Sequence, residues 1–399
     1  MYTAYIVDIL RTPVGKFAGT LSSVRPDDMA ALVMKEIVAR NPNLDPALIE
    51  DVVMGAANQA GEDNRNVARM ALLLAGLPQE IGGVTVNRLC ASGLQSIIDA
   101  SRAISSGDGE VYLAGGVESM TRAPFVMAKA ETAYSRTPEI YDTTIGWRFA
   151  NEKLSKLHYP FAMGETAENV ADRYNISRET QDEFAHSSQV KYKAAAEAGK
   201  FRDEIVPVHI PQRKGENIVF DTDEHPRLSS VEKLASLSPA FKKGGSVTAG
   251  NSSGINDGAA VSIVVSEEIL KRYNLTPMAR VVSAAVAGVD PAHMGMGPVP
   301  ATQKALKRAG LSINDLDLIE LNEAFASQAV ACMNELGLDP AKVNVNGGSI
   351  AIGHPLGASG TRISATLLHE MKRSASARYG LATMCVGVGQ GVAVIYEKV

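Results

Sequence analysis

The stretch from residue 84 to residue 93 contains the side chain with the clearest chemical potential, Cys90. The β-branched run Val84-Thr85-Val86 predicts a short strand, and Ala91-Ser92-Gly93 opens an apolar, periodic stretch that predicts a helix. A thiol at a helix N-terminus lies near unpaired backbone N–H groups and the positive end of the helix dipole, and both favour the nucleophilic thiolate. Because a free cysteine is more often a buried structural residue, the role of Cys90 depends on which groups the fold brings to it.

Further motifs that could do chemistry follow expected strands or glycine-rich turns. They are Thr248-Ala249-Gly250-Asn251-Ser252-Ser253-Gly254, Asn322-Glu323-Ala324-Phe325, Gly353-His354-Pro355-Leu356-Gly357 and Cys385-Val386-Gly387-Val388-Gly389-Gln390-Gly391. Taken alone, His354 is typical of a turn or core histidine, Cys385 of a core thiol and Asn322 of a turn or cap. The glycine runs have neither the Gly-x-Gly-x-x-Gly spacing in a βαβ context nor a Walker lysine, which excludes a Rossmann or P-loop nucleotide site.

Two similar segments of the chain must position these motifs. In the first, residues 48–53 lead to strands expected at 84–86 and 111–116, with Leu89-Cys90-Ala91-Ser92-Gly93 and a helix between them. In the second, residues 316–321 lead to strands expected at 343–345 and 381–385, with Leu356-Gly357-Ala358-Ser359-Gly360 and a helix between them. Helical periodicity follows each Ala-Ser-Gly, at Leu94, Ile97, Ile98 and Ile104, and at Ile363, Leu367, Leu368 and Met371. Matched order and spacing predict two α/β halves with buried strands.

The region between these segments has a different composition. Residues 121–241 carry more charge and fewer strand-like runs, and they include a long helix with Ser177 as its N-cap and an end near Gly199. We therefore expect an inserted loop domain at 121–241. The N-terminal half would comprise 1–120, completed by about 242–270, and the C-terminal half 271–399. Residues 133–150 show little periodicity, which favours an exposed excursion or an oligomer contact.

Composition limits the class of protein. The chain has 399 residues, of which 45% are hydrophobic and 21% charged, an ordinary globular balance. A net charge of −5 argues against a nucleic-acid partner, and three cysteines fit a reducing compartment better than a disulfide scaffold. The first residues predict a strand rather than a targeting segment, and no apolar run approaches the ~18 residues of a membrane span. We expect a soluble, cytoplasmic protein without a membrane partner.

Taken together, the motifs resemble the signature set of the thiolases. The resemblance rests on six motifs in order: residues 87–93, Gly115-Gly116-Val117-Glu118-Ser119-Met120, Asn322-Glu323-Ala324-Phe325, Asn346-Gly347-Gly348, residues 353–357 and the Cys385 loop. It extends from Arg11-Thr12-Pro13 to Gly391. Thiolases interconvert a 3-ketoacyl-CoA plus CoA with acetyl-CoA and a shortened acyl-CoA. The resemblance implies an α/β fold, a duplicated pair in αβαβα layers with an inserted loop domain. It also implies no metal and no cofactor, with coenzyme A as substrate or product.

The resemblance also implies roles for individual residues. Cys90 would attack the acyl thioester and hold the acyl group covalently. His354 would take the thiol proton and, with Asn322 acting through a water, polarise a thioester carbonyl. Cys385 would be the general acid and base. The backbone N–H groups of Cys90 and Gly387 would form a second oxyanion hole. Cys332 lies in an apolar helical stretch without a motif, so we expect a core residue.

By the same resemblance, seven residues would line the channel for CoA: Met163, Arg227, Phe241, Ala249, Ser253, Ala324 and Phe325. Arg227 would face the nucleotide, and small residues would let the pantetheine pass the backbone. Core packing is an equally good explanation for Phe241 and for Phe325. The family likeness and the loop insertion also imply a homotetramer, a dimer of dimers.

The substrate and the reaction class leave alternatives. The primary expectation is acetoacetyl-CoA or another short-chain 3-ketoacyl-CoA, as in fatty acid metabolism. Many acetoacetyl-CoA-forming thiolases have a histidine where this chain has Ala162, before Met163-Gly164, and the segment 58–69 also resembles β-ketoadipyl-CoA thiolases of aromatic degradation. A β-ketoacyl synthase needs no second cysteine, so Cys385 argues against that class. A non-catalytic acyl-CoA-binding relative would not need Cys90, His354, Asn322 and Cys385 together.

Overall fold

The computed structural model describes residues 2–399, and its main feature is a mixed sheet of ten strands. The strand order is β12-β13-β14-β11-β1-β10-β5-β3-β4, with the short β2 paired to β10. The strands are β1 (Ala4–Arg11), β2 (Gly15–Lys16), β3 (Asp51–Gly55), β4 (Gly82–Val86), β5 (Val111–Ser119), β10 (Asn256–Ser266), β11 (Ala279–Gly288), β12 (Leu318–Leu321), β13 (Tyr379–Val386) and β14 (Gln390–Lys398). Strands β1 and β11 pair antiparallel through Tyr5–Arg280 and Ile6–Ala279, which joins the two halves of the sheet.

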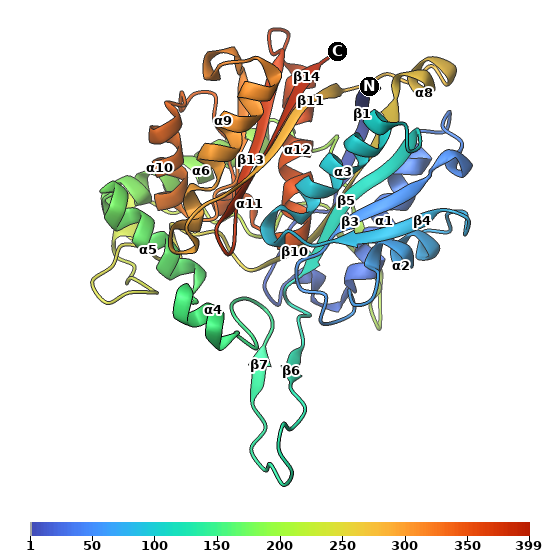
Figure 1. Cartoon of the computed structure of the whole chain (residues 1–399). Coiled ribbons are helices and arrows are strands. Elements are labelled where there is room, and N and C mark those ends of the chain that lie inside the picture. The colour runs from blue at the N-terminus through green and yellow to red at the C-terminus, as the bar shows by residue number, and fades with distance from the viewer. Residues whose placement is uncertain (1) are drawn as a thin grey trace.

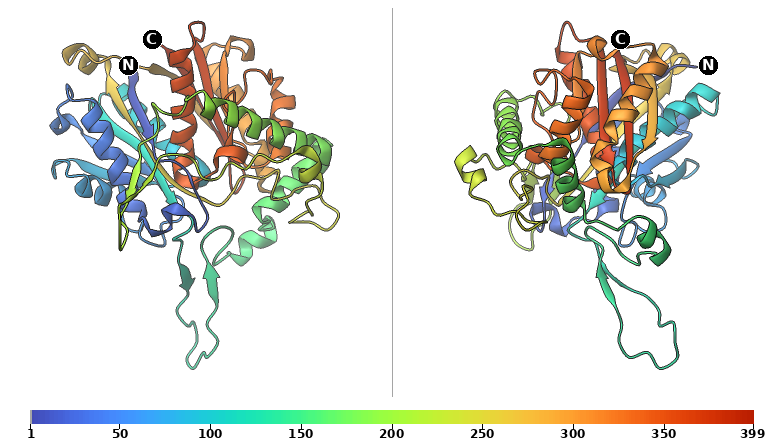
Figure 2. Two further views of the ribbon diagram at one scale, coloured as in Figure 1. Left: turned by 180° about the vertical axis from the view of Figure 1, so that it is seen from behind. Right: turned by 60° about the vertical axis from the view of Figure 1, so that its left-hand side comes forward.

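Helices cover this sheet in three layers (Figure 1, Figure 2). Helices α1 (Pro26–Arg40) and α2 (Val67–Leu74) pack on the N-terminal half of the sheet. Helices α9 (Pro298–Ala309) and α10 (Ala326–Leu336) pack on the C-terminal half, whereas α3 (Ser92–Ser106) and α12 (Leu356–Arg373) lie between the halves. The expected αβαβα layering is thereby confirmed. Two shorter helices, α8 (Glu267–Arg272) and α11 (Ser349–Ile352), connect these elements.

The two central helices, α3 and α12, are the helices of the sequence repeat. The periodic apolar residues that predicted them form one shared core, made of Leu94, Ile97, Ile98, Ile104, Ile363, Leu367, Leu368 and Met371. A Cβ at Gly93 would lie 2.6 Å from the carbonyl oxygen of Gly357, and a Cβ at Gly360 would overlap the backbone of Leu94. Glycine therefore ends both Ala-Ser-Gly motifs because the helices touch there. Cys90 and His354 immediately precede these two helices, so their contact brings both residues together.

The second copy of the repeat departs from its expected strand at 343–345. Only Val343 forms an isolated bridge, to Ile319 of β12. Asn344 has a φ of 45°, and its side chain exchanges two hydrogen bonds with the backbone of Leu321, at 2.9 Å and 2.8 Å. The side-chain amide takes over the backbone pairing that a longer strand would supply. The prediction of a strand here was wrong beyond that one bridge.

Residues 121–241 contribute no strand to the ten-stranded sheet. The small sheets pair β6 (Phe125–Met127) with β7 (Ile140–Asp142) and β8 (Val208–Ile210) with β9 (Ile218–Phe220). The helices are α4 (Glu152–Leu157), α5 (Met163–Tyr174), α6 (Arg178–Glu197) and α7 (Val231–Ala235). Ser177 caps α6 as expected, since its side chain accepts from the N–H of Thr180. The division at 121 and 241 stays a prediction, although β10 does lie between β1 and β5.

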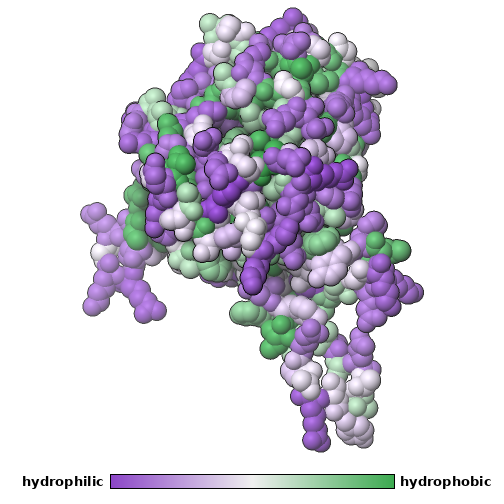
Figure 3. Space-filling view, turned by 90° about the vertical axis from the view of Figure 1, so that its left-hand side faces the viewer, coloured by the Kyte–Doolittle hydropathy of each residue, from purple (hydrophilic) through white to green (hydrophobic). Residues whose placement is uncertain are grey.

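A hairpin arm, residues 125–142, extends away from the body of the molecule (Figure 1). Figure 3 shows that it stands clear and carries both hydrophilic and hydrophobic residues. Phe125 is 74% exposed and Tyr134 94%. This part of the chain is the exposed excursion that the sequence predicted. No helix in residues 2–399 combines the length and apolar character that a membrane span needs.

Candidate active site

Cys90 lies in a single 3-10 turn, Leu89–Ala91, between strand β4 and helix α3. Leu89 has a φ of 45°, in the left-handed region that non-glycine residues rarely adopt, so the turn is strained at the residue before the thiol. Two backbone N–H groups, of Gly387 and of Cys90 itself, form hydrogen bonds to the thiol. Both lower the thiol pKa, but burial outweighs them and raises the pKa of Cys90 to about 11. The helix start therefore does not by itself make Cys90 a thiolate, and a base must take the proton.

Cys385 lies near the end of β13 and is buried, 1% exposed. Its thiol pKa is well above its usual value, first because of burial and then because of the neighbouring Cys90 thiol. A negative charge on one sulfur therefore opposes a charge on the other, and both cysteines line the same cavity. The loop after β13 turns sharply at Val388 and Gly389, whose φ values are 60° and 77°. By contrast, Cys332 is 0% exposed in α10 and donates to the carbonyl oxygen of Gly295, which confirms it as a core residue.

His354 precedes α12 and is 4% exposed. Its backbone N–H donates to Asn256 Oδ1 at 2.9 Å, and its Nδ1 lies 2.6 Å from the Ser359 hydroxyl. Burial, with a smaller contribution from the cation of Arg362, lowers the pKa of His354 to about 3. The imidazole is therefore neutral at physiological pH and able to accept a proton.

A chain of hydrogen bonds decides which nitrogen of His354 carries the proton. Arg362 can only donate, and its Nη2 donates to Ser349 Oγ at 2.5 Å. The Ser349 hydroxyl then donates to Asn322 Oδ1 at 2.6 Å, which turns the Asn322 amide N–H group toward His354 Nε2, 3.5 Å away. Nε2 therefore presents its lone pair, and the proton sits on Nδ1.

Ser359 completes this assignment. Its hydroxyl proton is used by the carbonyl oxygen of Pro355, at 2.8 Å, so Ser359 Oγ accepts from Nδ1–H of His354. The base that the site offers is thus His354 Nε2. Ser359, Ser349 and Arg362 were missed as site residues by the sequence reasoning, although Ser359 belongs to the repeated Ala-Ser-Gly motif.

Two acidic residues of the sequence motifs hold loops in place through hydrogen bonds to their carboxylates. The Glu118 carboxylate accepts from the N–H groups of Ala57, Asn58 and Gly357, and burial raises its pKa to about 7. The Glu323 carboxylate accepts from Ser188, Asn344 and the N–H of Ile350. Both are nearly fully buried, at 1% exposed. They fix the backbone around His354 and Asn322.

Two cavities meet at Cys90. The larger, about 590 Å³, contains Cys90, His354 and Cys385 in its wall. All seven residues expected to line a CoA channel also line it: Met163, Arg227, Phe241, Ala249, Ser253, Ala324 and Phe325. Phe241 and Phe325 pack edge to face, with ring centroids 6.3 Å apart, so they form one wall. Lys16 and Arg227 supply positive charge to a mostly apolar channel, as an anionic, pantetheine-bearing ligand requires.

His225 also lines this larger cavity and was missed by the sequence reasoning. It is 9% exposed, and its buried Nε2 has no hydrogen-bond partner among residues 2–399. Burial lowers the pKa of His225 to about 4. Gly254 leaves room for the ring, because a Cβ there would overlap His225. No motif in the sequence marks this histidine.

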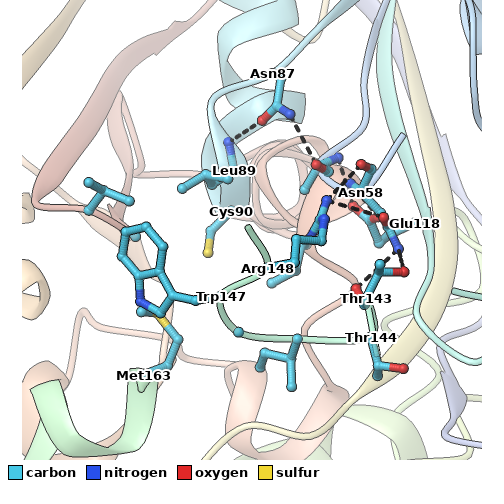
Figure 4. Close-up of a pocket in the computed structure, with 16 residues that line it drawn as sticks. Asn58, Asn87, Leu89, Cys90, Glu118, Thr143, Thr144, Trp147, Arg148 and Met163 are labelled. Carbon is cyan, nitrogen blue, oxygen red and sulfur yellow. Dashed lines mark hydrogen bonds between the residues drawn. The ribbon is translucent and has the colours of Figure 1, made fainter. Parts of the chain in front are cut away.

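The second cavity, about 380 Å³, adjoins the larger one and shares Cys90 and Met163 with it (Figure 4). It is lined by Asn58, Glu118 and residues 143–148, together with Gly387 and Met163. The expectation that 133–150 serves only as an excursion was therefore incomplete, because its end returns to the site. Trp147 and Arg148 were missed. The chain's single tryptophan beside an arginine, in a stretch without periodicity, was the available signal.

Comparison with known proteins identifies the family to which the chain is similar. Two family models match, one described as Thiolase, N-terminal domain, over residues 4–268 and one as Thiolase, C-terminal domain, over residues 275–398. A 3-oxoadipyl-CoA/3-oxo-5,6-dehydrosuberyl-CoA thiolase of Escherichia coli is 55% identical over 100% of both chains. A beta-ketoadipyl-CoA thiolase of Pseudomonas aeruginosa is 55% identical over 99% of both, and an acetyl-CoA acetyltransferase of Syntrophomonas wolfei is 49% identical over 98% of both.

Solved structures agree with the family models. An acetyl-CoA acetyltransferase of Bacillus anthracis superposes with a TM-score of 0.94 at 43% identity, covering 100% of this chain and 99% of the other. Human mitochondrial 3-ketoacyl-CoA thiolase in complex with CoA superposes with a TM-score of 0.92 at 41% identity, covering 100% and 98%. The fold expected from the sequence repeat is therefore confirmed over its whole length.

Proposed function

The chain belongs to the thiolase family and is a thiolase acyltransferase, and we propose that the 3-ketoacyl-CoA it cleaves is 3-oxoadipyl-CoA. The observation that carries this choice is the 55% full-length identity with relatives named for that substrate, against 49% with an acetyl-CoA acetyltransferase. This difference in identity favours 3-oxoadipyl-CoA, the substrate alternative that the segment 58–69 suggested, over acetoacetyl-CoA. Ala162, in place of the histidine of many acetoacetyl-CoA-forming thiolases, supports the same choice. The products would be succinyl-CoA and acetyl-CoA.

In the proposed reaction, His354 Nε2 takes the Cys90 proton as the sulfur attacks the C3 carbonyl of the 3-ketoacyl-CoA. The C2–C3 bond breaks, and the electron pair goes to C2 of the departing acetyl-CoA, which Cys385 protonates. CoA then enters and gives its thiol proton to the Cys385 thiolate. The CoA sulfur attacks the acyl-enzyme, acyl-CoA leaves, and Cys90 recovers its proton from His354. Atoms and charges balance without a cofactor.

The site offers donors for both negatively charged oxygens in this scheme. The backbone N–H groups of Cys90 and Gly387 lie beside the Cys90 sulfur, within reach of the oxygen on the carbon that the sulfur attacks. Once Nε2 of His354 holds the proton it becomes a donor and, beside the Asn322 amide, faces the enolate oxygen of acetyl-CoA. Deleting one such donor in other enzymes costs about 3 kcal/mol of transition-state stabilisation. Because the thiols and the imidazole are neutral before the reaction, the negative charge that forms depends on these donors for its stabilisation.

A thiolysis panel tests the proposed substrate. The kcat/KM of the purified protein should be highest for 3-oxoadipyl-CoA, compared with acetoacetyl-CoA and 3-oxohexanoyl-CoA, with succinyl-CoA and acetyl-CoA formed in equal amounts. A higher kcat/KM for acetoacetyl-CoA would contradict the proposed substrate. It would favour the acetoacetyl-CoA alternative, which the similarity to the acetyl-CoA acetyltransferase of Syntrophomonas wolfei supports.

We further propose that the protein assembles as a homotetramer through the hairpin arm. The arm carries exposed apolar side chains, among them Phe125, Met127, Tyr134 and Ile140. Large exposed apolar side chains clustered on one projecting element mark protein contacts.

A further inference from the structure

The second cavity contains an arginine that the reaction scheme does not use. Arg148 is partly buried in its wall, and Figure 4 shows its side chain between Cys90 and Asn58. Only Nη2 is engaged, with the backbone oxygen of Asn58 at 3.0 Å and its Oδ1 at 3.3 Å. Among residues 2–399, no carboxylate forms an ion pair with this guanidinium, and Nε and Nη1 donate to no residue. A cation in an apolar cavity, with most donors unused, is costly unless a ligand supplies an anion.

Glu118 is the other formally charged residue in this wall, and it does not neutralise Arg148. Its two carboxylate oxygens accept three backbone N–H groups, from Ala57, Asn58 and Gly357. Burial raises the pKa of Glu118 to about 7, which weakens its negative charge near neutral pH, whereas an arginine stays protonated. The cavity therefore attracts an anion.

The loop that carries Arg148 is fixed at both ends. Asn58 Nδ2 donates to both oxygens of Thr143 at 3.2 Å, and Thr143 Oγ1 donates to the carbonyl oxygen of Pro124 at 2.6 Å. Trp147 Nε1 donates to the carbonyl oxygen of Phe161 at 3.1 Å. The guanidinium is therefore held in place before a ligand arrives, which reduces the entropy lost on binding.

Position identifies the part of a substrate that would reach Arg148. In the proposed reaction, Cys90 bonds to the acyl carbon and the CoA part lies in the larger cavity, which contains Lys16 and Arg227. The second cavity adjoins the first at Cys90, so it is the space open to an acyl tail that extends from the sulfur. In 3-oxoadipyl-CoA, a carboxylate lies three bonds beyond the attacked carbon. We infer that Arg148 binds the terminal carboxylate of a dicarboxylic 3-ketoacyl-CoA and selects it over the uncharged chain, an inference that rests on the proposed function.

The test compares two substrates that differ at one end, 3-oxoadipyl-CoA and 3-oxohexanoyl-CoA, the second carrying a methyl group in place of the carboxylate. Arg148→Met should lower kcat/KM for 3-oxoadipyl-CoA by roughly tenfold to a hundredfold, because a hydrogen bond to a charged group is lost. The loss should appear mainly in KM, since the carboxylate is bound before and during reaction. The kcat/KM for 3-oxohexanoyl-CoA should stay within about threefold or rise.

Two further variants sharpen the comparison. Arg148→Lys keeps the charge but not the planar pair of donors, so it should retain an intermediate preference for the dicarboxylate. Arg213→Met, at an exposed arginine in the β8–β9 turn, should change neither substrate and serves as the control for charge removal.

Each outcome bears on a different claim. If Arg148→Met lowers kcat/KM equally for both substrates, Arg148 only braces Asn58 and the inference is overturned. If the variant keeps the wild-type preference for 3-oxoadipyl-CoA, the inference is again overturned while the proposed function stands. If the wild-type protein itself does not prefer 3-oxoadipyl-CoA over 3-oxohexanoyl-CoA, the proposed function fails, and carboxylate selection by Arg148 fails with it.

Discussion

Substitution of Ser359 by alanine tests the assignment of His354 Nε2 as the base. Ser359 Oγ accepts from Nδ1–H at 2.6 Å and has no contact with the thiol in the proposed chemistry. Removing it leaves Nδ1–H unpaired in a buried position. While the imidazole is neutral, that bond contributes about 1 kcal/mol. When His354 takes the Cys90 proton, the bond becomes charge-assisted and contributes roughly 1.5–3 kcal/mol. The loss of the bond therefore raises the acylation barrier by the difference, about 0.5–2 kcal/mol, which slows acylation by about 2- to 30-fold.

The measurement is the single-turnover rate of acyl-enzyme formation at Cys90, followed by quenched flow and mass spectrometry. Ser359→Thr keeps the hydroxyl and should recover most of the rate. Ser364→Ala is the matched control, because Ser364 is buried on the same helix and bonds to Gly360 and Tyr396 instead. An acylation rate of wild-type size in Ser359→Ala would refute the tautomer argument. Equal losses in Ser359→Ala and Ser364→Ala would attribute the effect to packing of α12.

Four other predictions address the two thiols, the histidine and the arm. Cys90→Ser should abolish acyl transfer and acyl-enzyme formation. Cys385→Ala should still form acetyl-enzyme from acetyl-CoA but not the C–C bond, and full condensation activity would disprove its role as acid and base. Because burial lowers the pKa of His354 from 6.5 to about 3, the unfolded chain binds a proton as pH falls through 6.5 and the folded chain does not. We expect the unfolding free energy of the wild-type protein, measured by urea denaturation, to fall between pH 7 and pH 5. The fall should exceed that of His354→Gln by up to about 2 kcal/mol. Parallel plots of unfolding free energy against pH for the two proteins would contradict a neutral imidazole. Deleting residues 128–139 should convert tetramers to smaller species in light scattering, and a monomeric wild-type protein would contradict the proposed assembly.

The fold was predictable from the sequence where local pattern and tertiary packing agree. The residues from Leu94 to Ile104, and from Ile363 to Met371, have a helical period because one face of each helix meets the same core. Prediction failed at 343–345, where Val343, Asn344 and Val345 have strand-like composition. There the Asn344 side chain competes for the Leu321 backbone, and only its three-dimensional placement reveals that competition.

The motif residues of the site could be predicted from the sequence, whereas the residues that hold them in place could not. Cys90, His354 and Cys385 stand in short motifs, and the structure places all three in the wall of one cavity. Their catalytic roles stay predictions. The thiol pKa of Cys90 could not be read from its helix position, because burial depends on segments far away in sequence. Arg148 and Trp147 were missed for the same reason, since the loop 143–148 reaches the site only through contacts with Asn58 and Phe161.

The duplication explains how one scaffold can place a thiol and an imidazole together. In the first copy, the Ala-Ser-Gly serine, Ser92, accepts from the N–H of Arg88 and donates to the carbonyl oxygen of Leu89, so it braces the strained turn that holds Cys90. In the second copy, the corresponding Ser359 braces His354. The glycines that follow let the two helices touch, which sets the two braced residues side by side. An alanine at Gly360 would push α12 away from α3 and so separate thiol from imidazole. An alanine at Gly288, where the nearest atom to a new Cβ lies 3.9 Å away, would leave that spacing unchanged. The spacing between the Cys90 thiol and the His354 imidazole thus depends on the absence of side chains at Gly93 and Gly360.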